Sequence, residues 1–161
     1  MAWQSDWFFM KFSTRRDTEL TAERLFQSLV DFARLERILA RRGAAVTRFD
    51  PDQQPVVGAG WHIGFDWRGR RRDLRLELVR RETSERLVLA GQSEAFDLTI
   101  DLGVMALSRQ RSRLSFESEV KPRNMRARLM LQTAKLGRAQ LDRQFDAGVG
   151  RLLAELTAGR G

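Results

Sequence analysis

The chain has 161 residues, a formal net charge of +8 and no cysteine. This length suits a single domain with its own core, and the missing cysteines exclude disulfides, thiolate metal sites and cysteine nucleophiles. No apolar run approaches the ~20 residues needed to span a bilayer, and the N-terminus does not resemble a secretion signal. We therefore expect a cytoplasmic protein.

The basic residues are almost all arginine. Only Lys11, Lys121 and Lys135 are lysines, so 26 of the 29 basic residues are arginine. A bias of this kind is typical of a GC-rich genome, and the charges are spread along the chain, which favours a solvated basic surface. The alternative is a face that binds an anionic partner such as nucleic acid or lipid.

Residues 1–9 differ in composition from the rest of the chain. We interpret them as an N-terminal extension, with Met10 as a second candidate for the initiator; alternatively, their aromatic residues pack onto the domain or onto a partner. Residues 10–158 are expected to form one domain, and residues 159–161 a short tail.

The first element after the extension is an expected edge strand. Polar and apolar residues alternate from Met10 to Leu20, the period of a half-buried strand. Two short helices should follow, the first capped by Thr21 and the second by Asp31, and Gly43 is placed to end the second.

Strand patterns then continue almost to residue 121. Alternating segments separated by turns predict six more strands in an antiparallel meander with one apolar face. They are expected near residues 45–49, 61–67, 74–78, 86–93, 96–102 and 114–120.

The last quarter of the chain, residues 125–158, is predicted to form one helix about 50 Å long. Small or apolar residues recur every three or four positions along it, so one face can cover the sheet. Gly137 and the pair Gly148 and Gly150 each cost ~1 kcal/mol inside a helix, so we expect a bend or a close sheet contact there.

This order of elements resembles the START-like helix-grip superfamily, also called SRPBCC, which includes polyketide cyclases and lipid-transport-like proteins. The resemblance is carried by Phe12 and Ser13, by residues 21–26 (Thr-Ala-Glu-Arg-Leu-Phe) with Asp31, by Gly58-x-Gly60-Trp61 and by Lys121-Pro122. It implies an α+β fold: a seven-stranded antiparallel sheet wrapped around a long C-terminal helix, with two short helices after the first strand. It also implies a deep cavity between sheet and helix, commonly used for apolar ligands.

The candidate cavity residues are the apolar residues expected on the inner face of the sheet and on the long helix. They are Phe12, Trp61, Ile63, Phe65, Trp67, Leu74, Leu76, Phe96, Leu98, Ile100, Leu114, Phe116, Met130, Ala134, Leu141 and Phe145.

No catalytic residue is assigned. His62, the only histidine, is expected to face solvent because its strand parity is opposite to that of Trp61 and Ile63. The strand carboxylates share that outer parity and are expected to pair with arginines. With one histidine and no cysteine, we expect no metal site and no cofactor.

Arg68, Arg70, Arg71 and Arg72 form the densest basic cluster and are the candidate anion-binding residues. The alternative is a solvated turn, because the sequence places no aromatic stacking platform beside the cluster. Gly58-Ala59-Gly60 is not a dinucleotide fingerprint, since a strand rather than a helix follows it.

Three functions are consistent with the sequence. The first is non-catalytic binding or carriage of a hydrophobic small molecule or lipid in the sheet–helix cavity. The second is a polyketide cyclase or hydrolase, which requires an inward polar group such as Thr14, Ser118 or Thr133. The third is an arginine-rich module for RNA, ribosome or membrane surfaces. The oligomeric state is not predicted.

Overall fold

The computed structural model describes residues 9–67 and 69–159. Most of the expected N-terminal extension (residues 1–8), Arg68 and the last two residues of the expected tail lie outside the described residues.

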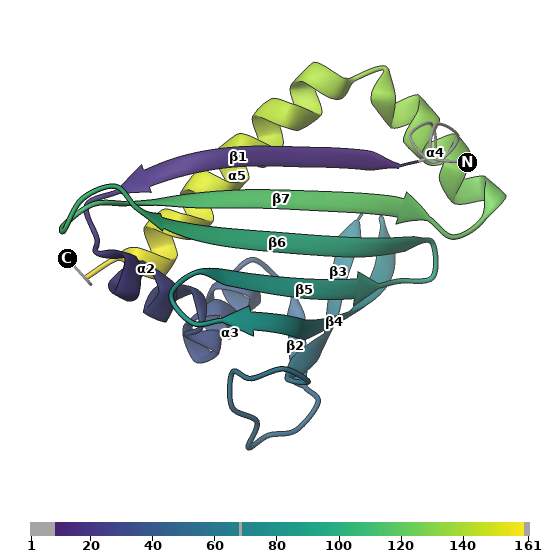
Figure 1. Ribbon diagram of the computed structural model, residues 1–161. Helices are drawn as coiled ribbons and strands as arrows, with labels where there is room; N and C mark the ends of the chain where they lie inside the picture. The colour runs from purple at the N-terminus through teal and green to yellow at the C-terminus, as the bar shows by residue number, and fades with distance from the viewer. Residues whose placement is uncertain (1–8, 68, 160–161) are drawn as a thin grey trace.

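Seven strands form one antiparallel sheet in the order β1-β7-β6-β5-β4-β3-β2 (Figure 1). The chain runs from β2 to β7 as a meander, and β1 joins the far side of β7 at the edge. This confirms the predicted meander and the predicted edge position of the first strand. The strands are β1 (Met10–Thr18), β2 (Ala45–Arg48), β3 (Gly60–Trp67), β4 (Arg70–Glu82), β5 (Arg86–Gln92), β6 (Phe96–Ala106) and β7 (Ser112–Pro122).

Two short helices, α2 (Ala22–Leu29) and α3 (Phe32–Arg41), follow β1 as predicted. The Thr21 hydroxyl accepts a hydrogen bond from the backbone N–H of Arg24, and the Asp31 carboxylate accepts one from Arg34, both at 3.2 Å. Gly43 follows α3 with φ +93°, the left-handed conformation that glycine adopts without steric cost.

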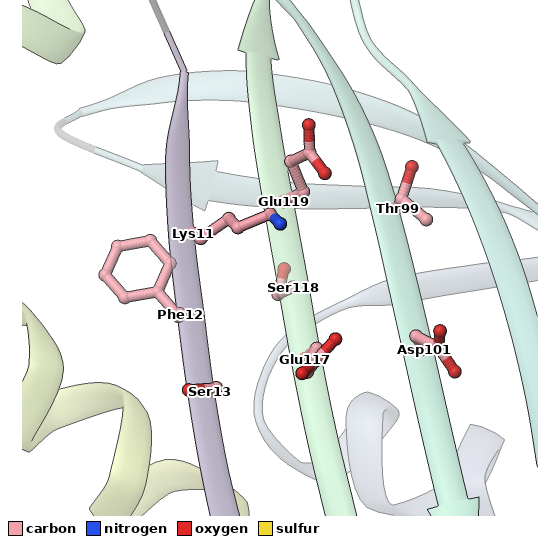
Figure 2. A pocket seen from close by; sticks show the side chains of 8 residues that line it. All are labelled: Lys11, Phe12, Ser13, Thr99, Asp101, Glu117, Ser118 and Glu119. Carbon is pink, nitrogen blue, oxygen red and sulfur yellow. The ribbon is translucent and has the colours of Figure 1, made fainter. Parts of the chain in front are cut away.

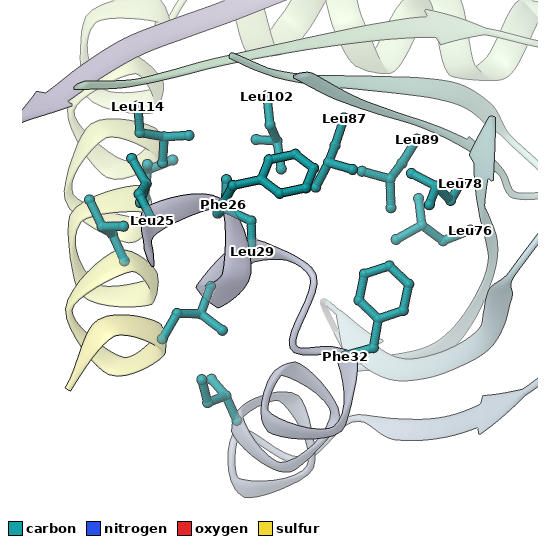
Figure 3. Close-up of a cluster of buried hydrophobic side chains, with 14 of the residues drawn as sticks. Leu25, Phe26, Leu29, Phe32, Leu76, Leu78, Leu87, Leu89, Leu102 and Leu114 are labelled. Atoms are coloured by element: carbon teal, nitrogen blue, oxygen red, sulfur yellow. The ribbon is translucent and has the colours of Figure 1, made fainter. Parts of the chain in front are cut away.

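The core lies between the inner face of the sheet and these two helices, together with Val149, Leu153 and Leu156 of α5 (Arg138–Thr157) (Figure 3). Leu25, Phe26 and Phe32 project from the helices toward leucines of β4, β5, β6 and β7. Leu78 and Leu87 are almost completely buried. Beyond Leu78 the pairing register between β4 and β5 shifts by one residue. In this part of β4 the Arg81 guanidinium lies 5.4 Å from the centre of the Phe26 ring.

The C-terminal segment is two helices, which corrects the prediction of one continuous helix. α4 (Met125–Lys135) and α5 (Arg138–Thr157) meet at Leu136 and Gly137. The last turn of α4 closes with i→i−3 hydrogen bonds, from Leu136 to Thr133 and from Gly137 to Ala134, at 3.1 and 3.0 Å. The bend expected at Gly137 is therefore confirmed, and it is large enough to end the helix.

A polar cluster fastens α5 to the edge strand β1. Arg16 donates to the Asp146 carboxylate at 2.8 Å and to its backbone carbonyl at 2.7 Å, and Thr14 donates to the same carboxylate. A Cβ built on Gly150 would lie 3.0 Å from the Arg16 guanidinium. The close sheet contact expected for the Gly148–Gly150 pair is therefore present at Gly150.

Glu36 ties α3 to strands β2 and β3. Its carboxylate accepts hydrogen bonds from Arg48 at 2.6 and 3.0 Å and from the Trp61 indole N–H at 2.9 Å. Burial alone would raise the pKa of Glu36, but the hydrogen bonds from Arg48 and Trp61 outweigh it and lower that pKa below its ordinary value. The Trp61 ring packs edge-on against Phe32, 4.6 Å between centroids.

We predict that Glu36→Gln lowers the free energy of unfolding by about 1–2 kcal/mol near neutral pH, because hydrogen bonds to a charged acceptor are lost. A carboxylate with a lowered folded-state pKa contributes stability above its unfolded-state pKa of about 4.3 and loses it as pH falls through the folded-state pKa. Urea denaturation of both proteins over falling pH should therefore show the difference shrinking below about pH 4.3. Glu85→Gln, in the exposed β4–β5 turn, is the control. A difference independent of pH would contradict the role assigned to the Glu36 charge.

Candidate functional site

An inner cavity of about 370 Å³ lies between the sheet, α2, α3 and α5. All 17 side chains that line it are apolar, and most are leucines. The space is partly open rather than fully enclosed. The lining residues are Leu29, Leu35, Leu39, Ala44, Ile63, Phe65, Leu74, Leu76, Leu89, Ile100, Leu102, Leu114, Phe116, Val149, Leu152, Leu153 and Leu156.

A second, larger space is a groove of about 760 Å³ beneath α4 and the start of α5. Its walls come from β1, the end of β7, the tip of β3 and the start of β6. Its lining is mainly apolar, with a few polar side chains. The lining residues are Met10, Phe12, Trp67, Phe96, Val120, Arg126, Leu129, Met130, Leu131, Thr133, Ala134, Gly137, Gln140, Leu141 and Gln144.

Phe145 of α5 stands between the two spaces. Its ring centroid lies 5.4 Å from that of Phe12, which lines the groove, and 5.4 Å from that of Phe116, which lines the inner cavity. The three rings form a partition at the point where α5 crosses the inner face of the sheet.

The candidate cavity residues divide between these spaces. Phe145 forms the partition, whereas Trp61 lies in the core against Phe32 and Leu98 lies close to the backbone of Gly91. Seven candidates line the inner cavity: Ile63, Phe65, Leu74, Leu76, Ile100, Leu114 and Phe116. Six line the groove: Phe12, Trp67, Phe96, Met130, Ala134 and Leu141.

Trp67 lines the groove but is more exposed than expected for a residue on the inner face of the sheet. It ends β3, is 41% exposed and lies 5.5 Å from the Arg72 guanidinium. The alternation of β3 predicts the direction of its side chain but not whether anything covers that end of the strand.

Sequence reasoning missed the cavity walls that the helices supply. Leu35 and Leu39 of α3 and Leu152 and Leu153 of α5 all line the inner cavity. The helical spacing of Leu35 and Leu39 marks an inward face, but spacing cannot distinguish a residue packed against a neighbour from one facing an empty volume.

The arginines of the β3–β4 hairpin line a third space, similar in volume to the inner cavity. Arg70, Arg71 and Arg72 line about 370 Å³ together with Phe65 and Trp67, so aromatic residues do lie beside the basic cluster. Arg71 also lies 3.7 Å from the Asp66 carboxylate. Anion binding at this hairpin stays a prediction, and Arg68 lies outside the described residues.

The outer face of the sheet carries the carboxylates, as the strand parity predicted (Figure 2). Arg86 pairs with Asp101, and Arg113 with Asp17 at 2.7 Å. The hydrogen bond from Arg86 lowers the pKa of Asp101, and that from Arg113 lowers the pKa of Asp17. Among the residues that the structure describes, no group of three or more His, Cys, Asp or Glu is placed to hold a metal ion.

The polar residues considered for catalysis do not converge. His62 is exposed and packs against Phe49, 5.0 Å between ring centroids. Ser118 is buried in β7, Thr14 donates to Asp146, and Thr133 lies along the groove. The 17 residues that line the inner cavity include none of these four.

Comparison with known proteins places the fold. No protein-family model matches the chain, and no curated protein matches it. Solved structures do. The protein Mll3558 from Rhizobium loti is 20% identical with a TM-score of 0.64, over 93% of this chain and 96% of that one.

Two further solved structures are similar to this chain over most of its length. The ZhuI aromatase/cyclase from Streptomyces sp. R1128 is 11% identical with a TM-score of 0.64, over 92% of this chain and 93% of that one. A START superfamily protein from Mycobacterium smegmatis is 13% identical with a TM-score of 0.54, over 83% and 95%. The protein has a START-like helix-grip fold. The C-terminal helical segment of this fold is divided into α4 and α5.

We predict that Leu153→Phe leaves the free energy of unfolding unchanged or raises it by up to about 1 kcal/mol, because the larger ring enters the inner cavity. Leu25→Phe is the matched control: Leu25 is also a helix leucine, is fully buried and does not line the cavity. Overpacking there should cost about 1–3 kcal/mol. Urea denaturation gives both values, and an equal loss in the two variants would show that the cavity is not available to side chains.

Proposed function

We propose that this protein binds a hydrophobic small molecule or lipid in the inner cavity, without catalysis, and that the groove beneath α4 is the route to it. The observation that carries the proposal is the apolar lining of the inner cavity, 17 side chains around about 370 Å³. The proposal assigns the thirteen cavity-lining and groove-lining candidates, with Phe145 between them, to ligand contact or passage.

The lining determines which molecules suit the cavity. A polar group placed there would lose its hydrogen bonds to water and find no side-chain donor or acceptor, at a cost of several kcal/mol. An apolar ligand has no such cost and gains about 25 cal/mol for each Å² of its surface removed from water. The cavity volume falls within the usual range for small-molecule sites, about 300–1,000 Å³.

The size of the groove supports the same proposal. At about 760 Å³ the groove is larger than the inner cavity and mainly apolar, so a longer molecule can occupy both spaces if Phe145 moves. The structural neighbours include an aromatase/cyclase and a START superfamily protein. They support a cavity-based function through the shared fold alone.

A pair of adjacent substitutions on β6 tests the proposal. Ile100 lines the inner cavity, whereas Thr99 is exposed on the outer face. We expect Ile100→Trp to weaken binding of the neutral fluorescent probe N-phenylnaphthylamine by at least about tenfold, because the indole occupies the space that the ligand needs. Thr99→Trp should leave the affinity unchanged. Equal probe affinity in the wild type and both variants would reject the inner cavity as the site.

A kinetic experiment tests the route. Phe145→Ala removes the ring between groove and cavity, so we expect the probe dissociation rate measured by stopped-flow fluorescence to rise by about tenfold or more, with a smaller change in affinity. Gln144→Ala, at the next position on α5 and lining only the groove, is the control. An unchanged dissociation rate in Phe145→Ala would mean that the ligand leaves by another path.

A further inference from the structure

α4 carries apolar side chains on two faces. Ala127 and Leu131 are buried, but Met125, Leu129 and Leu136 are 65%, 57% and 89% exposed. At 3.6 residues per turn, positions 125 and 129 lie about 40° apart around the helix, and Leu136, which caps α4 with helical backbone angles, falls on the same side. These three residues therefore form a single exposed apolar stripe, called the outer stripe below.

Basic side chains flank the outer stripe on both sides. By the same helical geometry Arg128 and Lys135 lie on one side of the stripe and Arg126 on the other. The sequence from 120 to 141 contains six basic residues and no acidic one. Acidic partners lie outside this stretch: Glu119 is 3.5 Å from Lys121, Asp97 is 3.6 Å from Arg123 and Asp142 is 3.0 Å from Arg138.

The outer stripe also borders the groove. Leu129 and Arg126 belong both to this surface and to the groove lining, and Trp67, 41% exposed, lies along the same groove on the β3–β4 hairpin. In Figure 1, α4 lies at one end of the sheet and the β6–β7 hairpin at the other. Whatever covers the outer stripe therefore also meets the groove.

We propose that α4 docks onto the surface of an anionic lipid bilayer. The outer stripe enters the interface between headgroups and acyl chains, and Arg126, Arg128 and Lys135 contact lipid phosphates. A bilayer surface suits this pattern because it accepts apolar and cationic side chains at neighbouring depths, with long basic side chains reaching back to the headgroups. Among the described residues, none of the helices could span a bilayer.

The docking proposal does not depend on a ligand in the inner cavity, and it is tested on protein without one. Wild-type protein is mixed with vesicles of phosphatidylcholine alone, or with about one third phosphatidylglycerol added, and separated by flotation. We expect binding to the anionic vesicles and little to the neutral ones. Each basic residue near an anionic surface contributes a factor of about five to partitioning.

Two double variants address the two parts of the surface. Leu129→Ser with Leu136→Ser should lower partitioning into anionic vesicles by at least about tenfold, and Arg126→Gln with Arg128→Gln by about 25-fold. The controls lie at the other end of β7, in the β6–β7 hairpin: Met105→Ser with Leu107→Ser, which removes residues 60% and 38% exposed, and Arg109→Gln with Arg111→Gln. Both controls should bind like the wild type.

Three outcomes would overturn the proposal. One is the absence of binding to anionic vesicles at low salt. Another is equal loss of binding in the α4 variants and the hairpin controls, which would indicate diffuse charge attraction. The third is tight binding to single-stranded RNA that Leu129→Ser with Leu136→Ser does not weaken, together with weak vesicle binding. All the changed side chains are exposed, so we expect every variant to fold. Circular dichroism checks this.

Discussion

The structure depends on one constraint: a sheet with a single apolar face must have that face covered. Charged residues and their ion pairs occupy the outer face, where water solvates them. The elements that cover the apolar face must therefore pack on the inner side. α2, α3 and α5 supply this cover, and they do so from separate directions. The contacts of Arg16 and Thr14 with Asp146 fasten α5 to the β1 edge, and an apolar space remains between α5 and the sheet.

The densest packing and the cavity lie side by side within one hydrophobic core. Leu25, Phe26 and Leu78 pack densely at one end of the sheet, and Glu36 fastens α3 to β2 and β3 there. Farther along, the sheet and α5 diverge around an apolar volume, with Phe145 at its boundary. The side chains that line the cavity belong to the same hydrophobic core or pack against it, so the residues that stabilise the domain also bound the cavity.

Much of the fold can be predicted from the sequence, because strand alternation and helix capping depend on residues that are close together in the chain. Strand alternation determines which residues face inward, and the caps at Thr21 and Asp31 mark where the short helices begin. The end of α4 is not predictable in the same way: the helical spacing continues through Leu136, and only the cost of Gly137 indicates a change of direction. The family resemblance implies a cavity, but its walls depend on how far α5 stands from the sheet. That distance is set by tertiary contacts such as the one between Gly150 and Arg16.

The uniform lining of the inner cavity has a consequence for selectivity. A site that discriminates sharply does so by leaving a buried hydrogen-bonding group unpaired when the wrong molecule enters, whereas apolar walls distinguish molecules only by about 1–3 kcal/mol per methylene. A cavity lined by Leu, Ile, Val, Phe and Ala side chains can therefore sort its contents by volume and shape but not by functional group. Its occupants would form a family of similarly sized apolar molecules, and any sharper choice among them would have to be made at the polar margins of the groove.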